Sequence, residues 1–131
     1  MVTINLTDVG SGDVSVVAEL VRRMVSDVFN ERDAHRRAEA MAAVFADNVV
    51  FVDPEGTVSG LVAVAEKVRV LLDGAPGFVF RLAGPIQEVA DLGLDRWQFG
   101  PPGADPVVRG TDVATIADGR IVRLYTMIDA T

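Results

Sequence analysis

The chain has 131 residues, half of them hydrophobic, which suits a single domain with one buried core. Its formal net charge of −7 repels phosphate backbones and anionic lipid surfaces, so we expect neither nucleic acid nor a membrane as a partner. Because the sequence has no cysteine and a single histidine, it excludes disulfides and thiolate catalysis, and we expect no metal site.

The first half of the chain is predicted to be mainly helical, after a short strand or flexible arm over residues 1–12. Asp13 and Asp33 are expected to cap two helices, and Ser59-Gly60 begins a third that Gly74 closes. The apolar residues expected to face inward recur at helical spacing: Val14, Val17, Val21, Met24 and Val28; Ala38, Met41, Ala42 and Phe45; Leu61, Val64, Val68, Leu71 and Leu72. Residues 13–131 are interpreted as one domain, and without a signal-peptide pattern or a long apolar run we expect a cytoplasmic protein.

The second half of the chain changes to an alternating, strand-like pattern after residue 77. Strands are expected over residues 78–84, 86–91, 92–99, 107–117 and 120–129. The dipeptide Asp118-Gly119 favours a two-residue type I′ turn between the last two strands. Helices followed by antiparallel strands predict the α+β class, with the helices packed on one face of a curved sheet.

Asp53 ends the apolar run Val49 to Val52, which is the one strand expected in the first half. A carboxylate at this point either forms a turn with its own backbone ahead of Pro54 or faces a cavity at the end of the strand. A second buried acid nearby would favour a cavity-facing Asp53. Of two acids in apolar settings, one can act as a base while the other stays neutral and donates a hydrogen bond.

Asp112 is the candidate for that second acid, since it lies inside a strand among apolar neighbours. A two-residue turn would place Asp112 opposite Tyr125, on a face shared with Ala114, Ile116 and Ile121. A carboxyl beside a phenol can donate hydrogen bonds to a developing oxyanion. A slip of one residue would move Tyr125 to the opposite face.

Several short segments resemble one known superfamily. They are Phe45-Ala46-Asp47-Asn48 leading to Val52-Asp53-Pro54, then Leu82-Ala83-Gly84-Pro85, then Asp112-Val113 followed by Asp118-Gly119-Arg120-Ile121. Together they look like the ketosteroid-isomerase-like and SnoaL-like proteins of the nuclear-transport-factor-2-like superfamily. The resemblance implies a cone-shaped, curved, mainly antiparallel sheet wrapped over about three helices and enclosing a pocket, a cystatin-like α+β roll.

The resemblance also implies roles for individual residues. Asp53 matches the family's proton-shuttling base, and Asp112 matches the acid that stays protonated in the oxyanion hole. Counting back from Asp53, Phe29 stands where the isomerases have a tyrosine, so Tyr125 would have to supply the missing phenol. The residues expected to shape the cavity and contact the substrate are Phe29, Phe80, Trp97 and Met127.

Two functions remain open at this stage. The first is a cofactor-free enzyme that abstracts a proton next to the carbonyl of a small hydrophobic compound, as an isomerase, cyclase or dehydratase does. The second is a non-catalytic ligand-binding or dimerisation module on the same fold. A homodimer is expected by analogy, with Val113, Val122 and Leu124 offering apolar surface on the outer face of the sheet.

Overall fold

The computed structural model describes residues 15–129. Helix α1 (Val16–Arg23) continues directly into the π-helix η2 (Met24–Phe29), and helices α2 (Ala34–Val44) and α3 (Leu61–Asp73) follow. The Ser15 side chain caps α1 and the Asp33 side chain caps α2, each by accepting a hydrogen bond from a backbone N–H three residues later. The expected arm over residues 1–12 and the expected cap Asp13 lie outside the described residues.

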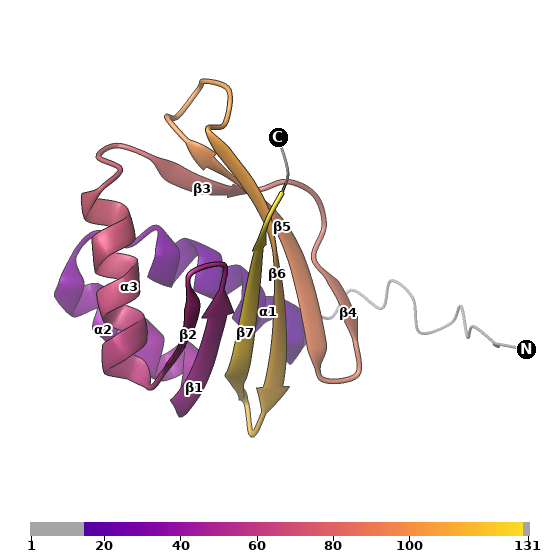
Figure 1. The fold of residues 1–131 in the computed structure, drawn as a ribbon. Coiled ribbons are helices and arrows are strands. Elements are labelled where there is room, and N and C mark those ends of the chain that lie inside the picture. The colour runs from indigo at the N-terminus through magenta and orange to yellow at the C-terminus, as the bar shows by residue number, and fades with distance from the viewer. Residues whose placement is uncertain (1–14, 130–131) are drawn as a thin grey trace, which may run out of the picture.

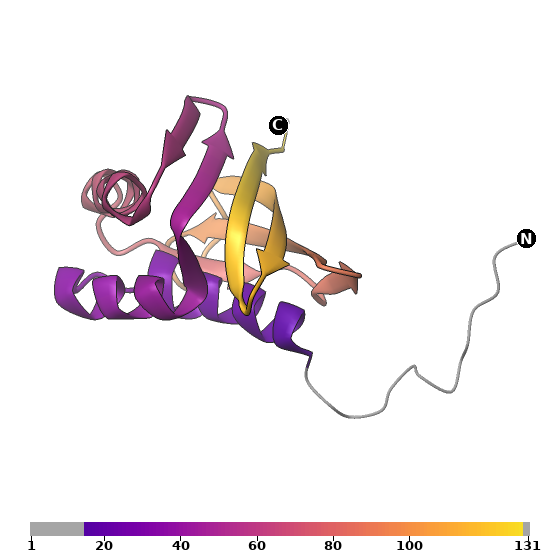
Figure 2. The ribbon, with the colours of Figure 1, turned by 90° about the horizontal axis from the view of Figure 1, so that it is seen from below.

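The strands form one curved, open sheet. Their bounds are β1 (Phe45–Asp53), β2 (Gly56–Ser59), β3 (Val79–Leu82), β4 (Gln87–Val89), β5 (Leu92–Gly100), β6 (Val108–Ala117) and β7 (Arg120–Ile128). The order is β2-β1-β7-β6-β5-β3, and β4 pairs with β5. Among the strands of residues 15–129, only β1 and β7 pair in parallel. The helices lie on one side of this sheet (Figures 1 and 2), so the predicted α+β class is confirmed.

The core lies between the helices and the inner face of the sheet. Its fully buried side chains include Val21, Met24 and Val28 from the first helical segment, Met41 and Val44 from α2, Val64 and Val68 from α3, and Phe45, Val49, Ile121 and Leu124 from the sheet. Burying one such aliphatic side chain contributes about 1.5–3 kcal/mol. Within residues 15–129, no helix is long and apolar enough to span a membrane.

Strands β1 and β2 differ from the prediction. Strand β1 begins at Phe45, four residues before Val49, because Phe45 is buried as the first residue of the strand and not on the preceding helix. Strand β2 was not predicted: the chain turns after Asp53 and pairs back onto β1. Gly56, with a φ of 137°, occupies a backbone conformation of this turn that other residues rarely adopt.

The turn between β6 and β7 follows the prediction. Asp118 and Gly119 both have positive φ, as a type I′ turn requires, and Ile116 pairs with Ile121 as expected. Beyond that pair the register shifts, since Thr115 pairs with Arg123. The chain therefore contains one extra residue in β7, a β-bulge.

The bulge reverses which side chains of β7 face inward. The expected pairing of Asp112 with Tyr125 is wrong, because Asp112 pairs with Thr126 and Tyr125 pairs with Val113. Leu124 is fully buried, so its assignment to the outer face is wrong as well. One added residue is sufficient for both changes because side chains alternate between faces with a period of two.

Candidate functional site

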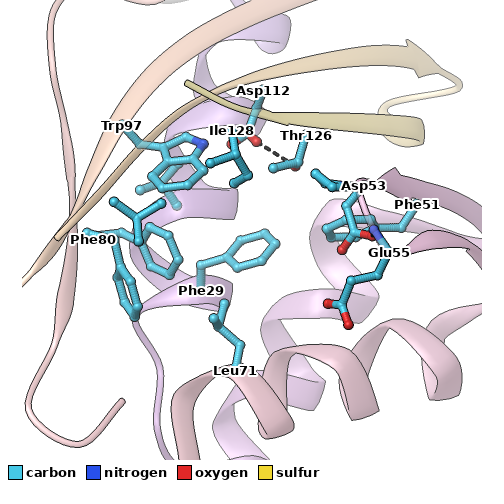
Figure 3. A pocket seen from close by; sticks show the side chains of 14 residues that line it. Phe29, Phe51, Asp53, Glu55, Leu71, Phe80, Trp97, Asp112, Thr126 and Ile128 are labelled. Carbon is cyan, nitrogen blue, oxygen red and sulfur yellow. Dashed lines mark hydrogen bonds between the residues drawn. The ribbon is translucent and has the colours of Figure 1, made fainter. Parts of the chain in front are cut away.

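A pocket of about 320 Å³ opens between η2, α3 and the inner face of the sheet (Figure 3). Residues from both ends of the chain line it: Val25, Phe29, Phe51, Asp53, Pro54, Glu55, Leu71, Phe80, Trp97, Phe99, Val108, Asp112, Thr126 and Ile128. Most of these side chains are apolar, and the volume lies near the lower end of the range for small-molecule sites. The pocket therefore suits a compact ligand with few polar groups.

Aromatic side chains form one wall of the pocket. Phe80 stacks on Phe99 with ring centroids 4.1 Å apart and meets the edges of Phe29 and Trp97 at 5.6 Å and 5.2 Å. Gly110 pairs with Trp97 across the strands, and a Cβ at Gly110 would overlap the indole ring. The glycine therefore allows the indole to lie flat against β6. Such a wall favours binding of flat, apolar groups.

The π-helix η2 supplies the floor of the pocket. Val25 and Phe29, one turn apart on this segment, both line it, and π-helical segments are frequent at functional sites. Asn30 ends the segment and exchanges two hydrogen bonds with the backbone of Phe80, at 2.8 Å and 2.7 Å. These bonds fix the position of β3, and with it the ring of Phe80, against the end of η2.

Asp53 faces the pocket and also forms the turn that follows it. Its position continues the alternation of the buried residues Val49 and Phe51, so its side chain points inward. Oδ1 accepts a hydrogen bond from the backbone N–H of Glu55 at 2.9 Å. The sequence left open whether Asp53 forms a turn or faces a cavity, and in the structure its side chain does both.

Lys67 on α3 contacts Asp53, a relationship that the sequence did not predict. Its Nζ lies 2.5 Å from Asp53 Oδ2, and the two side chains are only 21% and 13% exposed. The same ammonium group lies 5.6 Å from the centre of the Phe51 ring. Lys67 is the only lysine in the chain, which is the one signal that could have drawn attention to it.

Asp112 reaches the pocket from β6 and is 5% exposed. The hydroxyl of Thr126 donates to its Oδ1 at 2.7 Å (dashed line in Figure 3). Burial raises the pKa of Asp112, and hydrogen bonding, first from Thr126, acts in the opposite direction. A buried acid of this kind favours its neutral form.

Asp95 on β5 is a second buried acid, and it was not among the predicted site residues. It pairs directly with Asp112 across the strands and is 1% exposed. Burial, and then the charge of Asp112, raises the pKa of Asp95 to about 9. Asp95 lies two residues before Trp97 and four before Phe99, so the alternation of β5 could have placed it on the inner face.

The pocket collects most of the predicted site residues but not all of them. Asp53, Asp112, Phe29, Phe80 and Trp97 line it. Tyr125 and Met127 do not. They lie on the outer face of the sheet, 37% and 51% exposed, beside a shallow hollow. Thr126, which was not predicted, occupies the position beside Asp112 that had been assigned to Tyr125.

The described residues contain no group of three or more histidine, cysteine, aspartate or glutamate side chains placed to hold a metal ion. The polar groups that reach the pocket are carboxyls, a hydroxyl and an indole: Asp53, Glu55, Asp112, Thr126 and Trp97. These groups can accept or donate protons and hydrogen bonds.

Residues 21–124 match the sequence profile of the SnoaL-like domain. Among solved structures, the chain is similar to a protein of Agrobacterium tumefaciens strain C58, provisionally described as an isomerase of the SnoaL-like family. The identity is 25% and the TM-score 0.81, over 89% of this chain and 100% of that one. No curated protein sequence matches the chain.

Two further similar structures share the fold at lower identity. One is described as a polyketide cyclase from Sinorhizobium meliloti, with 23% identity and a TM-score of 0.66 over 94% of this chain and 99% of that one. The other is described as a ketosteroid isomerase from Kribbella flavida, with 13% identity and a TM-score of 0.68 over 88% of this chain and 79% of that one. Both descriptions are provisional.

Proposed function

Given that the chain belongs to the family of SnoaL-like domains, we propose that it is a cofactor-free enzyme that transfers a proton next to a carbonyl group. The substrate would be a small, mostly apolar compound. One observation carries the proposal: Asp53 and Asp112 reach the same apolar pocket from different strands. One acid is paired with a cation and the other is buried away from any cation among the described residues.

In this reaction the two acids have different tasks. Asp53, as a carboxylate, takes a proton from the carbon next to the carbonyl, and the electron pair of that C–H bond moves onto the carbonyl oxygen. Asp112, kept neutral by burial, donates a hydrogen bond to that oxygen. Asp53 then returns its proton to a different carbon or to a leaving group. Phe29, Phe80 and Trp97 hold the apolar part of the substrate.

Isomerisation, cyclisation and dehydration can all begin with this proton abstraction. The relatives described as an isomerase and as a polyketide cyclase agree with a reaction of this group. The pocket volume of about 320 Å³ favours a compact substrate over a large polycyclic one.

A non-catalytic ligand-binding module is the second candidate. Two observations favour it. Phe29 has no hydroxyl to donate to a developing oxyanion, and Tyr125 lies on the outer face. In addition, both oxygens of Asp53 already have partners within the chain, Glu55 and Lys67.

Solvent-deuterium exchange separates these two candidates. A panel of small enolisable ketones is incubated with the protein in heavy water, and deuterium incorporation next to the carbonyl is followed by mass spectrometry. The proposal predicts incorporation by the wild type, and a loss of about 100-fold or more in Asp53→Asn. Asp47→Asn, an exposed position on the same strand, is the matched control and should exchange as the wild type does. Equal exchange by wild type and Asp53→Asn contradicts the proposal.

A second copy of the chain is the proposed protein partner. The outer face of β1, β6 and β7 carries a hollow lined by Val52, Val113, Tyr125 and Met127. Tyr125 and Met127 are exposed apolar side chains at its centre, and contiguous apolar surface of this kind commonly marks an interface. This patch replaces the expected one, in which Leu124 was wrongly included.

A further inference from the structure

Asp95 and Asp112 lie side by side on the inner face of the sheet, and the proposed reaction uses only one of them. They are direct cross-strand partners on β5 and β6, a position that brings side chains on the same face within reach of each other. Asp112 lines the pocket, whereas Asp95 does not. Asp95 therefore lies behind Asp112 as seen from a bound ligand.

The surroundings of Asp95 disfavour its ionised form. Within residues 15–129, neither of its oxygens receives a hydrogen bond. An ionised carboxylate buried without donors is one of the most costly groups in a protein interior, and such a group takes up a proton instead. A protonated Asp95 has an O–H that requires an acceptor, and the carboxyl across the strand pair is Asp112.

No cation among residues 15–129 affects the pKa of Asp95. The first helical segment, which packs under β5, contributes buried side chains that are all apolar: Leu20, Val21, Met24, Val25, Val28 and Phe29. Glu19, Arg22 and Arg23 on the same segment pair with one another or with Asp27 at the surface. Asp53 and Glu55 share the pocket with Asp112, and both pair with Lys67. The neighbouring charge that raises the pKa of Asp95 is the charge that Asp112 carries when it is ionised.

We propose that Asp95 is a neutral positioning residue whose O–H donates to Asp112 and so makes Asp112 a proton donor to the ligand. The role of Asp112 as a proton donor rests on the proposed function. The hydrogen bond from Asp95 to Asp112 does not depend on that function. Asp112 then receives hydrogen bonds from two sides, Asp95 and Thr126. Both bonds strengthen when Asp112 becomes negative, so they stabilise the anion that remains after Asp112 gives up its proton.

The proton balance of this step is simple. Asp112 transfers the proton of its O–H to the enolate oxygen of the substrate, or to an oxygen that leaves, and keeps the electron pair. Asp95 retains its own proton throughout and shortens its hydrogen bond to the new carboxylate. When the product forms, the proton returns to Asp112 from the enol or from water. The reaction class favoured by this arrangement includes dehydration and aldol-type cyclisation, in which an oxygen must be protonated.

Two substitutions at Asp95 test the inference without any substrate. The protein is labelled with ¹³C at the aspartate carboxyl carbons, Asp112 is assigned from Asp112→Asn, and its titration is followed by NMR. In Asp95→Asn an amide N–H replaces the O–H donor, so the Asp112 midpoint should stay within about half a pH unit of the wild type. In Asp95→Leu the donor at position 95 is lost while Thr126 still donates to Asp112, and the midpoint should rise by about one unit or more.

Opposite results overturn the inference. If Asp95 is a carboxylate near neutral pH, Asp95→Asn removes a neighbouring negative charge and lowers the Asp112 midpoint by more than one unit. If Asp95 does not touch Asp112, Asp95→Leu leaves the midpoint unchanged. Because no ligand is present, a failure here leaves the deuterium-exchange test of the proposed function unaffected.

Infrared spectroscopy gives a second measurement that does not depend on Asp95→Leu folding. Protonated carboxyls absorb separately from carboxylates, and ¹³C labelling of aspartate identifies the aspartate bands. At pH 7 the wild type should contain two protonated aspartates, and Asp95→Asn and Asp112→Asn should contain one each. An unchanged band in Asp95→Asn contradicts the inference.

Discussion

Thr126, and not Tyr125, stands opposite Asp112 across the β6–β7 hairpin. The difference arises from a single extra residue in β7, between the pairs formed by Ile121 and Arg123. Because of it, a short hydroxyl side chain donates to Asp112 at 2.7 Å, and the one tyrosine of the chain lies on the outer face of the sheet. This end of the pocket therefore presents Asp112 and Thr126 to a ligand.

The first prediction concerns this hydroxyl. Thr126→Val removes the donor to Asp112 while preserving shape, so the pKa of Asp112 should rise further. The variant should also lose about 1 kcal/mol of stability, the usual contribution of one such hydrogen bond. Carboxyl NMR and urea denaturation measure the two effects.

Two control variants accompany this measurement. Thr126→Ser should retain the pKa and the stability of the wild type, and Tyr125→Phe should change neither by a comparable amount. A larger effect from Tyr125→Phe than from Thr126→Val contradicts the site as described.

The ion pair between Lys67 and Asp53 gives the second prediction. The two side chains are mostly buried, so Lys67→Met leaves a carboxylate at the pocket without its cation. We expect a loss of about 1–2 kcal/mol in the free energy of unfolding by urea, and a lower rate of deuterium exchange because Asp53 is no longer held in place. Arg69→Met is the control, since Arg69 forms only exposed ion pairs on the same helix and such pairs contribute little. Equal effects of the two variants would argue against a role for Lys67.

The third prediction is the pH dependence of stability. The pKa of Asp95 is about 9 in the folded protein and about 3.9 in an unfolded chain. Between these values the folded state holds a proton that the unfolded state has lost, so the free energy of unfolding falls as the pH rises. Burial also raises the pKa of Asp112, so its titration contributes to the pH dependence with the same sign. The stabilising contribution of the proton is therefore fully present below about pH 4 and is lost as the pH approaches about 9.

Asp95→Asn should remove much of this dependence. Between pH 5 and pH 8 the wild type should lose stability relative to Asp95→Asn by about 1 kcal/mol per pH unit, measured by urea denaturation. Asp47→Asn, which replaces an exposed acid on β1, should follow the wild-type curve. Parallel curves for wild type and Asp95→Asn would mean that Asp95 is not buried as a neutral acid.

Local signals in the sequence were sufficient for much of the fold and for the main candidates. The Asp118-Gly119 turn depends only on two residues that tolerate positive φ, and it forms as predicted. Asp53 and Asp112 could be selected because each interrupts or ends an apolar strand, and both reach the pocket. Phe29, Phe80 and Trp97 line the pocket as expected, whereas Phe99 was not predicted and Met127 lies outside the pocket.

The remaining features depend on contacts that no local pattern encodes. The bulge in β7 has no turn residue to mark it, and it decides the positions of Tyr125 and Thr126. The pair Asp95–Asp112 requires the register of β5 against β6, which a loop containing three prolines separates. The Lys67–Asp53 pair requires the packing of α3 against β1. Each arises from tertiary packing, so it becomes visible only in the folded chain.

The fourth prediction tests the proposed homodimer. Met127→Glu places a charge at the centre of the apolar outer face, so it should shift the protein from dimer to monomer in sedimentation velocity at micromolar concentration. Val62→Glu is the control, because Val62 is an exposed apolar residue on α3, away from this face. A wild type that sediments only as a monomer contradicts the proposed dimer.

The proposed function requires that the pocket present a neutral Asp112 to its ligand. The most direct measurement is the ¹³C carboxyl titration of Asp112 in the wild-type protein without ligand, from pH 3 to pH 9. Burial raises the pKa of this group, so the carboxyl should still be protonated at pH 7. A carboxyl that titrates near pH 4, as an ordinary aspartate does, would contradict the proposed role of Asp112.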